Sequence, residues 1–443
     1  MISYDLIVIG SGPGGYTTAA TAAATGLNVA IVERDLPGGT CLNRGCIPTK
    51  ALCRSAEVAL TVRSASEFGM ILSEAAVDYA AMVSRKNRIV DELRQGVETL
   101  LGKVTIIKGE AVFNSPTTIS VGDLQYTAPR IIVATGSRPA TLPVPGSELA
   151  VNSDFMLATS KLPQSLIIIG GGVIGMEFAS IYSALGVDVT VVEFCKEILP
   201  PFDSDIAKRL RMNMKRRGVK FHTSAQVTSL TSGPDGIAVN FTCKGKQNSV
   251  SAQTVLMAVG RTPVLPQGLE ALGIAMTRKA IAVDSAMRTS LPGVYAIGDV
   301  NGLCMLAHAA EVQGRVALGL EPMPQVIPSA VFTIPECAMA GLTEQQCADQ
   351  AIPYATAQTS FRANGKAMAM GEPDGIVKVI VNSQTNAIIG VHICGAHAAD
   401  LIQEAVMAMK AGFTAAQAAE AVHGHPTLSE LLLDAYRRLQ PTP

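Results

Sequence analysis

The feature that most constrains this 443-residue chain is an internal repeat. Residues 5–33 read DLIVIGSGPGGYTTAATAAATGLNVAIVE, and residues 166–193 read LIIIGGGVIGMEFASIYSALGVDVTVVE. Each segment runs as an apolar strand, a glycine turn, a helical stretch, a second apolar strand and a final glutamate. Four positions correspond at a constant displacement of 160 residues: Gly10, Gly12, Gly15 and Glu33 recur as Gly170, Gly172, Gly175 and Glu193. We therefore predict two copies of one βαβ unit.

Each glycine of the repeated G-x-G-x-x-G pattern has its own physical role. The first permits a tight turn, the second lets the backbone approach a pyrophosphate, and the third lets helix and strand pack closely. The phosphates then lie at a helix N-terminus, where free N–H groups and the helix dipole favour negative charge. Glu33 and Glu193 end the second strands, where a carboxylate binds ribose hydroxyls and repels a 2′-phosphate. At the site that holds nicotinamide this favours NAD over NADP, with Lys196 as a nearby positive charge.

Composition argues against several other functions. Lys and Arg (35) nearly balance Asp and Glu (36), so no basic field attracts nucleic acid or a membrane surface. The uncharged stretch 6–32 is interrupted by glycines, a proline and threonines, and no cation precedes it, so we interpret it as part of a soluble fold. We expect a cytoplasmic protein.

Further motifs mark strand ends and a change of architecture. The sequences ATGSRP at 134–139, AVGRTP at 258–263 and AIGDV at 296–300 each end an apolar stretch, as expected beside a bound nucleotide. They make Thr135, Gly136, Gly260 and Asp299 candidate cofactor residues. Alternating apolar strands in 102–133 and 221–259 predict an antiparallel excursion in each unit. Beyond about residue 328, strand-like VKVIVN and AIIGVHICG precede helical ADLIQEAVMAMKAG and a second helix past residue 424, which predicts a separate α+β domain.

The stretch GGTCLNRGCIPTKAL at 38–52 places Cys41 and Cys46 close together. Zinc binding is poorly supported, because the usual knuckle has two intervening residues and no second cysteine pair lies nearby. Two buried structural thiols and a redox disulfide are the other interpretations. A disulfide that closes so short a loop stabilises the fold only weakly, so it opens and closes without unfolding the chain. The surroundings favour this redox interpretation.

The neighbours of the cysteines support a reactive pair. We expect Gly38, Gly39 and Gly45 to form a turn, and Pro48 to lie in the first turn of a helix that begins just after Cys46. A helix N-terminus lowers the pKa of a nearby thiol, and Lys50 adds positive charge on the same face.

These motifs resemble the flavin-dependent pyridine nucleotide-disulfide oxidoreductases, most closely the branch that oxidises dihydrolipoamide. The resemblance covers essentially the whole chain. Besides the cysteine stretch and the two glycine motifs it includes, in the family's order, GGGVIGMEFAS at 170–180, AIGDV at 296–300, FRANGKAMAMGEPDGIVKV at 361–379 and HGHPTLSE at 423–430. It implies an α/β fold with two Rossmann-like dinucleotide-binding domains, for FAD and NAD, and a C-terminal α+β dimerisation domain. The implied boundaries are 1–145 (FAD-binding, with the redox disulfide), 146–265 (NAD-binding), 266–327 (central, completing the FAD site) and 328–443 (dimerisation).

The resemblance also implies residue roles. FAD lies along the first glycine motif and Glu33, with Asp299 near its ribityl and phosphate groups, and NAD lies on the second motif and Glu193. Lys50 lies beside the reactive nitrogen of the flavin with Glu177 as its ion-pair partner. The substrate thiolate attacks Cys41, Cys46 faces the flavin, and reduced flavin passes hydride to NAD⁺. His425 takes the thiol proton and Glu430 orients its ring, whereas His423 and His308 have structural roles and the other seven cysteines are buried packing residues.

The implied reaction is oxidation of protein-bound dihydrolipoamide to lipoamide with reduction of NAD⁺ to NADH, without a metal. The implied assembly is a homodimer in which the partner supplies His425, served by a lipoyl-bearing acyltransferase or carrier protein of a multienzyme complex. A related NAD(P)H-dependent disulfide or metal-ion reductase, like glutathione or mercuric reductase, is the alternative. Glu193 does not suit NADPH, and no cysteine follows Cys394 as mercuric reductase requires. Small departures from the family pattern are Arg44, Thr49 and Phe178.

Overall fold

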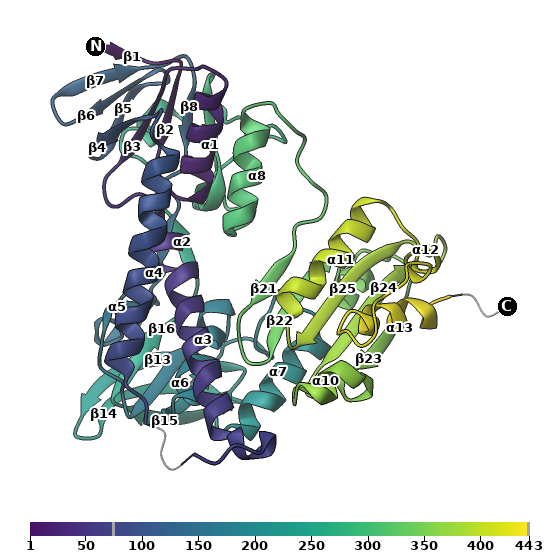
Figure 1. Ribbon diagram of the computed structural model, residues 1–443. Helices are drawn as coiled ribbons and strands as arrows, with labels where there is room; N and C mark the ends of the chain where they lie inside the picture. Colours follow the sequence, from purple (N-terminus) through teal and green to yellow (C-terminus); the bar gives the residue numbers. More distant parts are fainter. Residues whose placement is uncertain (73–75, 441–443) are drawn as a thin grey trace.

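The computed structural model describes residues 1–72 and 76–440. The first repeat forms a five-stranded parallel sheet in the order β20-β8-β2-β3-β4. Its strands are β2 (Leu6–Ile9), β3 (Val29–Glu33), β4 (Thr105–Lys108), β8 (Ile131–Val133) and β20 (Val294–Ala296). Strand β2 is LIVI and fully buried, as parallel strands covered on both faces are. Helices α1 (Pro13–Ala24) and α8 (Ala307–Ala317) pack against each other beside this sheet (Figure 1).

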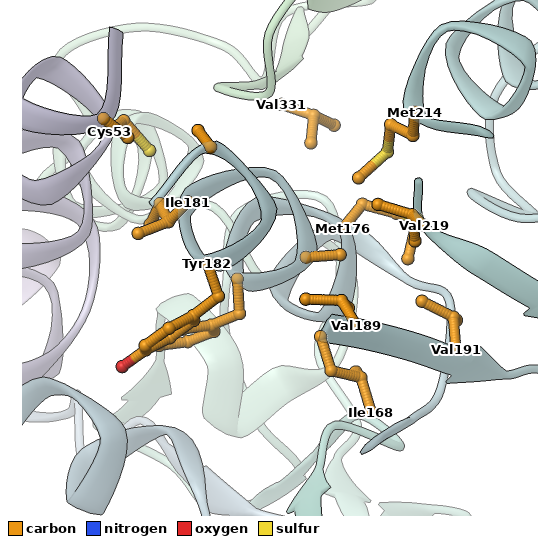
Figure 2. Close-up of a cluster of buried hydrophobic side chains, with 14 of the residues drawn as sticks. Cys53, Ile168, Met176, Ile181, Tyr182, Val189, Val191, Met214, Val219 and Val331 are labelled. Carbon is orange, nitrogen blue, oxygen red and sulfur yellow. The ribbon is translucent and has the colours of Figure 1, made fainter. Parts of the chain in front are cut away.

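The second repeat builds a four-stranded parallel sheet in the order β12-β11-β10-β16. Its strands are β10 (Ser165–Ile169), β11 (Asp188–Val192), β12 (Lys220–His222) and β16 (Thr254–Met257), with helices α6 (Val173–Ala184) and α7 (Ser204–Arg216). Figure 2 shows side chains of α6 lying among residues of β10, β11 and α7. The hydrophobic core of this unit therefore forms around α6.

The predicted antiparallel excursions are confirmed in both units. The first consists of β5 (Ala111–Ser115), β6 (Thr118–Val121) and β7 (Leu124–Thr127), to which β1 (Ile2–Ser3) adds in parallel. The second consists of β13 (Ala225–Gly233), β14 (Gly236–Cys243) and β15 (Lys246–Ala252). Strands β9 (Ser137–Pro139) and β17 (Arg261–Pro263) pair with each other, so the ATGSRP and AVGRTP motifs meet.

The cysteine stretch forms helix α2 and the start of helix α3, and these two helices contact helices of both units. Helix α2 (Gly39–Arg44) is short, and it stands where the glycines predicted only a turn. Of its residues only Leu42 and Arg44 are good helix formers, and Gly38 and Gly39 have φ values of 97° and 58° that direct the chain into it. Helix α3 (Cys46–Arg63) packs against α4 (Tyr79–Leu100) and α6, so the stretch after Cys46 contacts the second unit. Helix α5 (Ser153–Ala158) packs against α2.

The C-terminal part is the predicted α+β domain, and it stands beside the two nucleotide units (Figure 1). Its antiparallel sheet has the order β21-β22-β25-β24-β23. The strands are β21 (Ser329–Val331), β22 (Glu336–Gly341), β23 (Tyr354–Ser360), β24 (Ile376–Asn382) and β25 (Ile388–Gly395). The helices are α9 (Glu344–Asp349), α10 (Gly365–Ala369), α11 (Ala398–Lys410), α12 (Ala415–Ala419) and α13 (Glu430–Arg438).

Residues 266–327, predicted as a central domain, add elements to the first unit. Besides β20 and α8 they contain the short pair β18 (Met276–Thr277) and β19 (Ala280–Ile281). None of the helices within residues 1–72 and 76–440 is both long and apolar enough to cross a lipid bilayer.

Candidate active site

A cavity of about 430 Å³ lies at the carboxyl ends of the first sheet. In α/β sheets ligands bind at this edge. Its floor comes from residues just after β2, β3, β8 and β20, and its sides come from α2, the first turn of α3, α5 and α6. Of the predicted residues, those that line the cavity are Gly10, Gly12, Gly15, Glu33, Cys41, Cys46, Lys50, Thr135, Gly136, Glu177 and Asp299.

The glycine loop of the first unit fits a pyrophosphate. Gly10 has φ of 101°, and a Cβ on Gly15 would overlap the carbonyl oxygen of Gly10. A Cβ on Gly12 would meet nothing within 4 Å, so this position opens into the cavity. Pro13 then begins α1, whose free N–H groups face the same space. The residues present therefore fit the phosphate-bearing part of a dinucleotide such as FAD.

Both repeat glutamates are held by backbone amides. Glu33 accepts hydrogen bonds from the Ser11 N–H (2.8 Å), the Ser11 hydroxyl (2.7 Å) and the Asp35 N–H (2.8 Å). Glu193 accepts from the Gly171 N–H and from the Cys195 N–H (2.5 Å). Gly170, Gly172, Gly175, Glu193 and Gly260 lie outside the lining of the large cavity.

Asp299 belongs to a polar group that the sequence motifs only partly revealed. Its Oδ2 accepts a hydrogen bond from the Ser137 hydroxyl. Arg261 Nε donates to Ser137 Oγ at 2.7 Å and lies 3.8 Å from Asp299 Oδ2. We did not single out Ser137 or Arg261, although both lie inside the ATGSRP and AVGRTP motifs. The pairing of β9 with β17 brings them together.

The two cysteines stand at the junction of α2 and α3 as free thiols. A hydrogen bond from the Cys41 thiol, helped by the positive charge of Lys50 and opposed by burial, lowers the pKa of Cys46 to about 7. The same hydrogen bond and burial raise the pKa of Cys41 far above its usual range. Because the thiolate is the reactive form, the reduced pair holds its negative charge on Cys46 near neutral pH.

Lys50 and Glu177 form the predicted ion pair, across the boundary between the two units. Lys50 Nζ lies 2.9 and 3.1 Å from the Glu177 carboxylate oxygens. The N–H of Phe332 donates to the same carboxylate at 3.0 Å, and Nζ lies 4.6 Å from the centroid of the Phe332 ring. Burial lowers the pKa of Lys50, but the charge and hydrogen bond of Glu177 outweigh it, so the net pKa is raised. Phe332 carried no sequence signal that we recognised.

His425 and Glu430 contact each other in the C-terminal domain. His425 Nδ1 lies 2.9 Å from Glu430 Oε1, and Glu430 Oε2 accepts from the Thr427 N–H at 2.8 Å. The Thr427 amide and His425 lower the pKa of Glu430, which keeps it a carboxylate. The His425 side chain is 80% exposed, and neither residue lines the cavity with the cysteines. Within one chain, therefore, this pair and the dithiol are separate.

His423 and His308 contact other groups of the protein, and the remaining cysteines differ in burial. His423 contacts Glu404 and the Ala421 carbonyl oxygen, both at 3.0 Å, and His308 Nε2 contacts the Pro328 carbonyl oxygen at 2.8 Å. Cysteines 53, 337, 347 and 394 are buried as expected. The expectation was wrong for the half-buried cysteines 195, 243 and 304: Cys195 and Cys304 lie in connections, and Cys243 ends β14 at the margin of a hydrophobic cluster.

One acidic group has the spacing of a metal site among the described residues. It consists of Asp203, Asp205 and Glu344. The ammonium group of Lys378, whose side chain is fully buried, contacts all three carboxylates. The group therefore neutralises an internal lysine.

The first parallel-sheet unit has a dinucleotide-binding loop and a dithiol in one cavity, and a second parallel-sheet unit with the same glycine motif is joined to it. This combination is typical of a pyridine nucleotide-dependent flavoprotein. The chain belongs to the pyridine nucleotide-disulphide oxidoreductase family, whose model matches residues 4–314, and the family's dimerisation domain matches residues 327–436. The family uses FAD and NAD(H). The dimerisation-domain match supports the predicted homodimer.

Curated relatives match over almost their full length. The dihydrolipoyl dehydrogenase of Rhizobium etli is 40% identical, with 99% of each chain covered. The dihydrolipoyl dehydrogenase of Bacillus subtilis is 38% identical over 98% of this chain and 96% of that one. Among solved structures, the Cu(II) complex of the HOCl-induced flavoprotein disulfide reductase RclA from Escherichia coli has a TM-score of 0.88 at 27% identity, covering 99% of this chain and all of that chain.

Proposed function

We propose that this protein is a dihydrolipoyl dehydrogenase, which oxidises protein-bound dihydrolipoamide to lipoamide and reduces NAD⁺ to NADH. The observation that carries the proposal is the Cys41–Cys46 dithiol, which shares one cavity with a dinucleotide-binding loop and the Lys50–Glu177 pair. Full-length relatives of about 40% identity with this activity support it. FAD bound in the cavity supplies the two-electron transfer between the dithiol and NAD⁺.

The two cysteines have different roles, and the charge of Lys50 acts on Cys46. In the oxidised pair, a substrate thiolate attacks the Cys41 sulfur, forms a mixed disulfide and leaves Cys46 as the thiolate. Cys41 has no S–H to donate in the mixed disulfide, so the positive charge of Lys50 is what favours Cys46 as the leaving thiolate. The second substrate thiol then displaces Cys41, so lipoamide leaves and two electrons remain on the dithiol.

His425 is the proposed acid and base for the substrate thiols. Because Glu430 is a carboxylate that holds the proton on Nδ1, the lone pair of Nε2 is available to take a thiol proton. The exposure of His425 within one chain supports a shared site. Residues 41–50 of one protomer would then face His425 of the partner subunit.

The other residue roles and the assembly extend the same proposal. The first glycine motif, Glu33, Thr135, Gly136 and Asp299 hold FAD, and the second glycine motif, Glu193 and Gly260 hold NAD. We place the domain boundaries where the family resemblance implies them, after residues 145, 265 and 327. The partner is a lipoyl-bearing acyltransferase or carrier protein in the cytoplasm.

The direct test is the initial rate of NAD⁺ reduction by free dihydrolipoamide with FAD-loaded protein, beside NADP⁺. We expect turnover with NAD⁺ and little with NADP⁺, because the Glu193 carboxylate repels a 2′-phosphate. If NADH reduces the bound FAD but dihydrolipoamide gives no turnover, the lipoamide assignment is wrong. The substrate is then another disulfide or a metal ion.

The shared site has its own test. A Cys41→Ser chain and a His425→Ala chain are each expected to form inactive homodimers. Mixed dimers contain one intact site, so activity should return on subunit exchange. Confirmed heterodimers without activity would contradict a site built from two chains.

A further inference from the structure

The segment 332–334 of the C-terminal domain is bound to helix α6 of the second unit. It follows β21, and two of its main-chain amides donate to side chains of α6. The N–H of Phe332 donates to the Glu177 carboxylate at 3.0 Å, and the N–H of Ile334 donates to the Ser180 hydroxyl at 2.9 Å. Glu177 and Ser180 lie one turn apart on α6, and both are buried. The backbone of this segment is therefore fixed relative to the Glu177 carboxylate.

The ring of Phe332 contacts the first unit. Nζ of Lys50, on α3, lies over this ring at 4.6 Å from its centroid. This is inside the distance of about 6 Å at which an aromatic face attracts a cation. The same Nζ lies 2.9 Å from Glu177 Oε1, the oxygen that accepts the Phe332 N–H. One residue of the C-terminal domain thus contacts both members of the Lys50–Glu177 ion pair, through its ring and through its backbone.

The location of the Lys50 ammonium matters for the reactive thiol. Lys50 lies four residues after Cys46 on α3, so the two side chains share one helix face, and both line the cavity. The hydrogen bond from Cys41 is the largest influence and lowers the pKa of Cys46, and burial raises it. The charge of Lys50 lowers this pKa further, and that of Glu177 raises it. Because the flexible Lys50 side chain is 30% exposed, water competes for its ammonium unless other groups hold it in place.

We propose that Phe332 is a positioning residue, whose ring and backbone N–H hold the Lys50 ammonium and the Glu177 carboxylate together beside Cys46. The inference rests on the proposed function, since it takes the dithiol in this cavity as the reactive group, and it is independent of which disulfide is the substrate. In the proposed homodimer the C-terminal domain then serves two sites. Phe332 acts in the site of its own chain, and His425 acts in the site of the partner subunit.

The test compares Phe332→Leu, Phe332→Tyr and the matched control Tyr295→Leu in the FAD-loaded protein with its dithiol reduced. Leucine keeps the backbone N–H and apolar bulk but has no ring face, whereas tyrosine keeps the ring. Tyr295, on β20, has a second cation–π contact, with Arg130 at 5.3 Å, and does not line the cavity. The quantity measured is the pH midpoint of Cys46 thiolate formation, followed by the ultraviolet absorbance of the thiolate, with Cys46→Ser as the blank.

We expect Phe332→Leu to raise this midpoint, because an ammonium that moves away from a thiolate stabilises it less. The loss of one cation–π contact at a partly exposed site limits the shift to about 0.4–0.7 pH unit. From a pKa of about 7 for Cys46, such a shift lowers the thiolate fraction at pH 7 by about 2- to 3-fold. Phe332→Tyr and Tyr295→Leu should both keep the wild-type midpoint.

A wild-type midpoint in folded Phe332→Leu would overturn the proposal even if the variant unfolds more easily, because Phe332 would then only contribute packing. An equal shift in Phe332→Tyr or in Tyr295→Leu would also overturn it, because the ring over Lys50 would not be the cause. If Phe332→Leu does not fold, the midpoint of Phe332→Met, which also lacks a ring, decides. None of these measurements uses dihydrolipoamide. A shifted midpoint in a protein without dihydrolipoamide turnover would therefore support this inference and contradict only the lipoamide assignment.

Discussion

The two dinucleotide units have nearly the same loop geometry and different surroundings. Gly10 and Gly170 have φ values of 101° and 106°, and the residues before both helices, Gly12 and Gly172, are extended. In both units an amide of the glycine loop and the amide two residues beyond the glutamate bind its carboxylate. The backbone of the glycine motif therefore has the same conformation in both units.

The surroundings differ in two ways. Ser11 adds a hydroxyl donor to Glu33, whereas Gly171 at the equivalent position cannot, so Glu33 accepts three protein hydrogen bonds and Glu193 two. The first loop also opens into the large cavity, with Arg44 paired to Asp35 at its side. The comparison teaches that the glycine motif builds the same loop in both units, and that the units differ in the residues around that loop.

The largest effect on stability is expected for the Lys50–Glu177 ion pair, because Glu177 of the second unit lines the cavity of the first unit. Glu177→Gln leaves the Lys50 ammonium without its carboxylate, and removing one partner of a buried pair costs about 3–5 kcal/mol. Since Lys50 is 30% exposed, we expect the lower end, in the free energy of unfolding by urea. The control is Asp188→Asn, which breaks the exposed Lys220–Asp188 pair of the second unit and should cost less than about 1 kcal/mol. Equal losses would show that the pair does not couple the units.

Equivalent glycines should separate the two cofactors. In Gly15→Ala and Gly175→Ala the new Cβ overlaps the carbonyl oxygen of Gly10 or Gly170. Making room costs about 1–3 kcal/mol, which is about 5- to 150-fold in affinity. We expect Gly15→Ala to lose FAD and Gly175→Ala to keep FAD but bind NADH weakly, measured by flavin absorbance and by NADH titration. Loss of NADH binding in both variants, with FAD retained, would contradict the assignment of the units.

A single substitution can make the second unit resemble the first. A carboxylate has about four acceptor sites, and two on Glu193 remain for ribose hydroxyls. Gly171→Ser should place a competing hydroxyl there, while the matched control Gly171→Ala adds only the Cβ, which would lie 3.1 Å from Glu193 Oε2. We expect the serine variant to bind NAD⁺ about 2- to 12-fold more weakly than the alanine variant, the range for one hydrogen bond. Equal NAD⁺ affinities of the two variants would show that the free acceptor sites of Glu193 do not limit NAD⁺ binding.

Each unit also has a half-buried thiol, and the two should react differently. The pKa of Cys46 is lowered to about 7, whereas burial and Glu193 raise that of Cys195. In the reduced protein, iodoacetamide should modify Cys46 first, with a rate that falls about fivefold from pH 7 to pH 6 as the thiolate is protonated. Cys41→Ala removes the main cause of the lowered pKa and should slow the reaction at pH 7. Faster modification of Cys195, read by peptide mass spectrometry, would contradict this order.

Much of this arrangement could be predicted because it depends on local patterns. The repeat places glycines where the backbone needs them, and the short spacing of the cysteines fixes their proximity. The missed features depend on distant parts of the chain. Phe332 contacts Glu177 through a backbone N–H, which has no side-chain signature. Helix α2 was missed because its glycines favour a turn and it has no side-chain cap.

The smallest effect concerns Arg44, which departs from the family pattern between the cysteines. Its guanidinium pairs with Asp35, and the two side chains are 41% and 47% exposed. Exposed pairs contribute about 0.2–1 kcal/mol, so Arg44→Met should release FAD about 1.5- to 5-fold faster. The control is Arg54→Met, which removes the exposed Arg54–Glu57 pair of α3 outside the cavity.

Salt distinguishes an ionic contribution of Arg44 from a steric one. Screening shortens electrostatic interactions to about 3 Å at 1 M salt, so the difference between Arg44→Met and wild type should disappear there. In the second unit Cys195 stands at the position equivalent to Asp35, and an uncharged thiol cannot form this ion pair. NADH release should therefore depend less on salt than FAD release. The opposite ranking would show that the Arg44–Asp35 ion pair does not help to retain FAD.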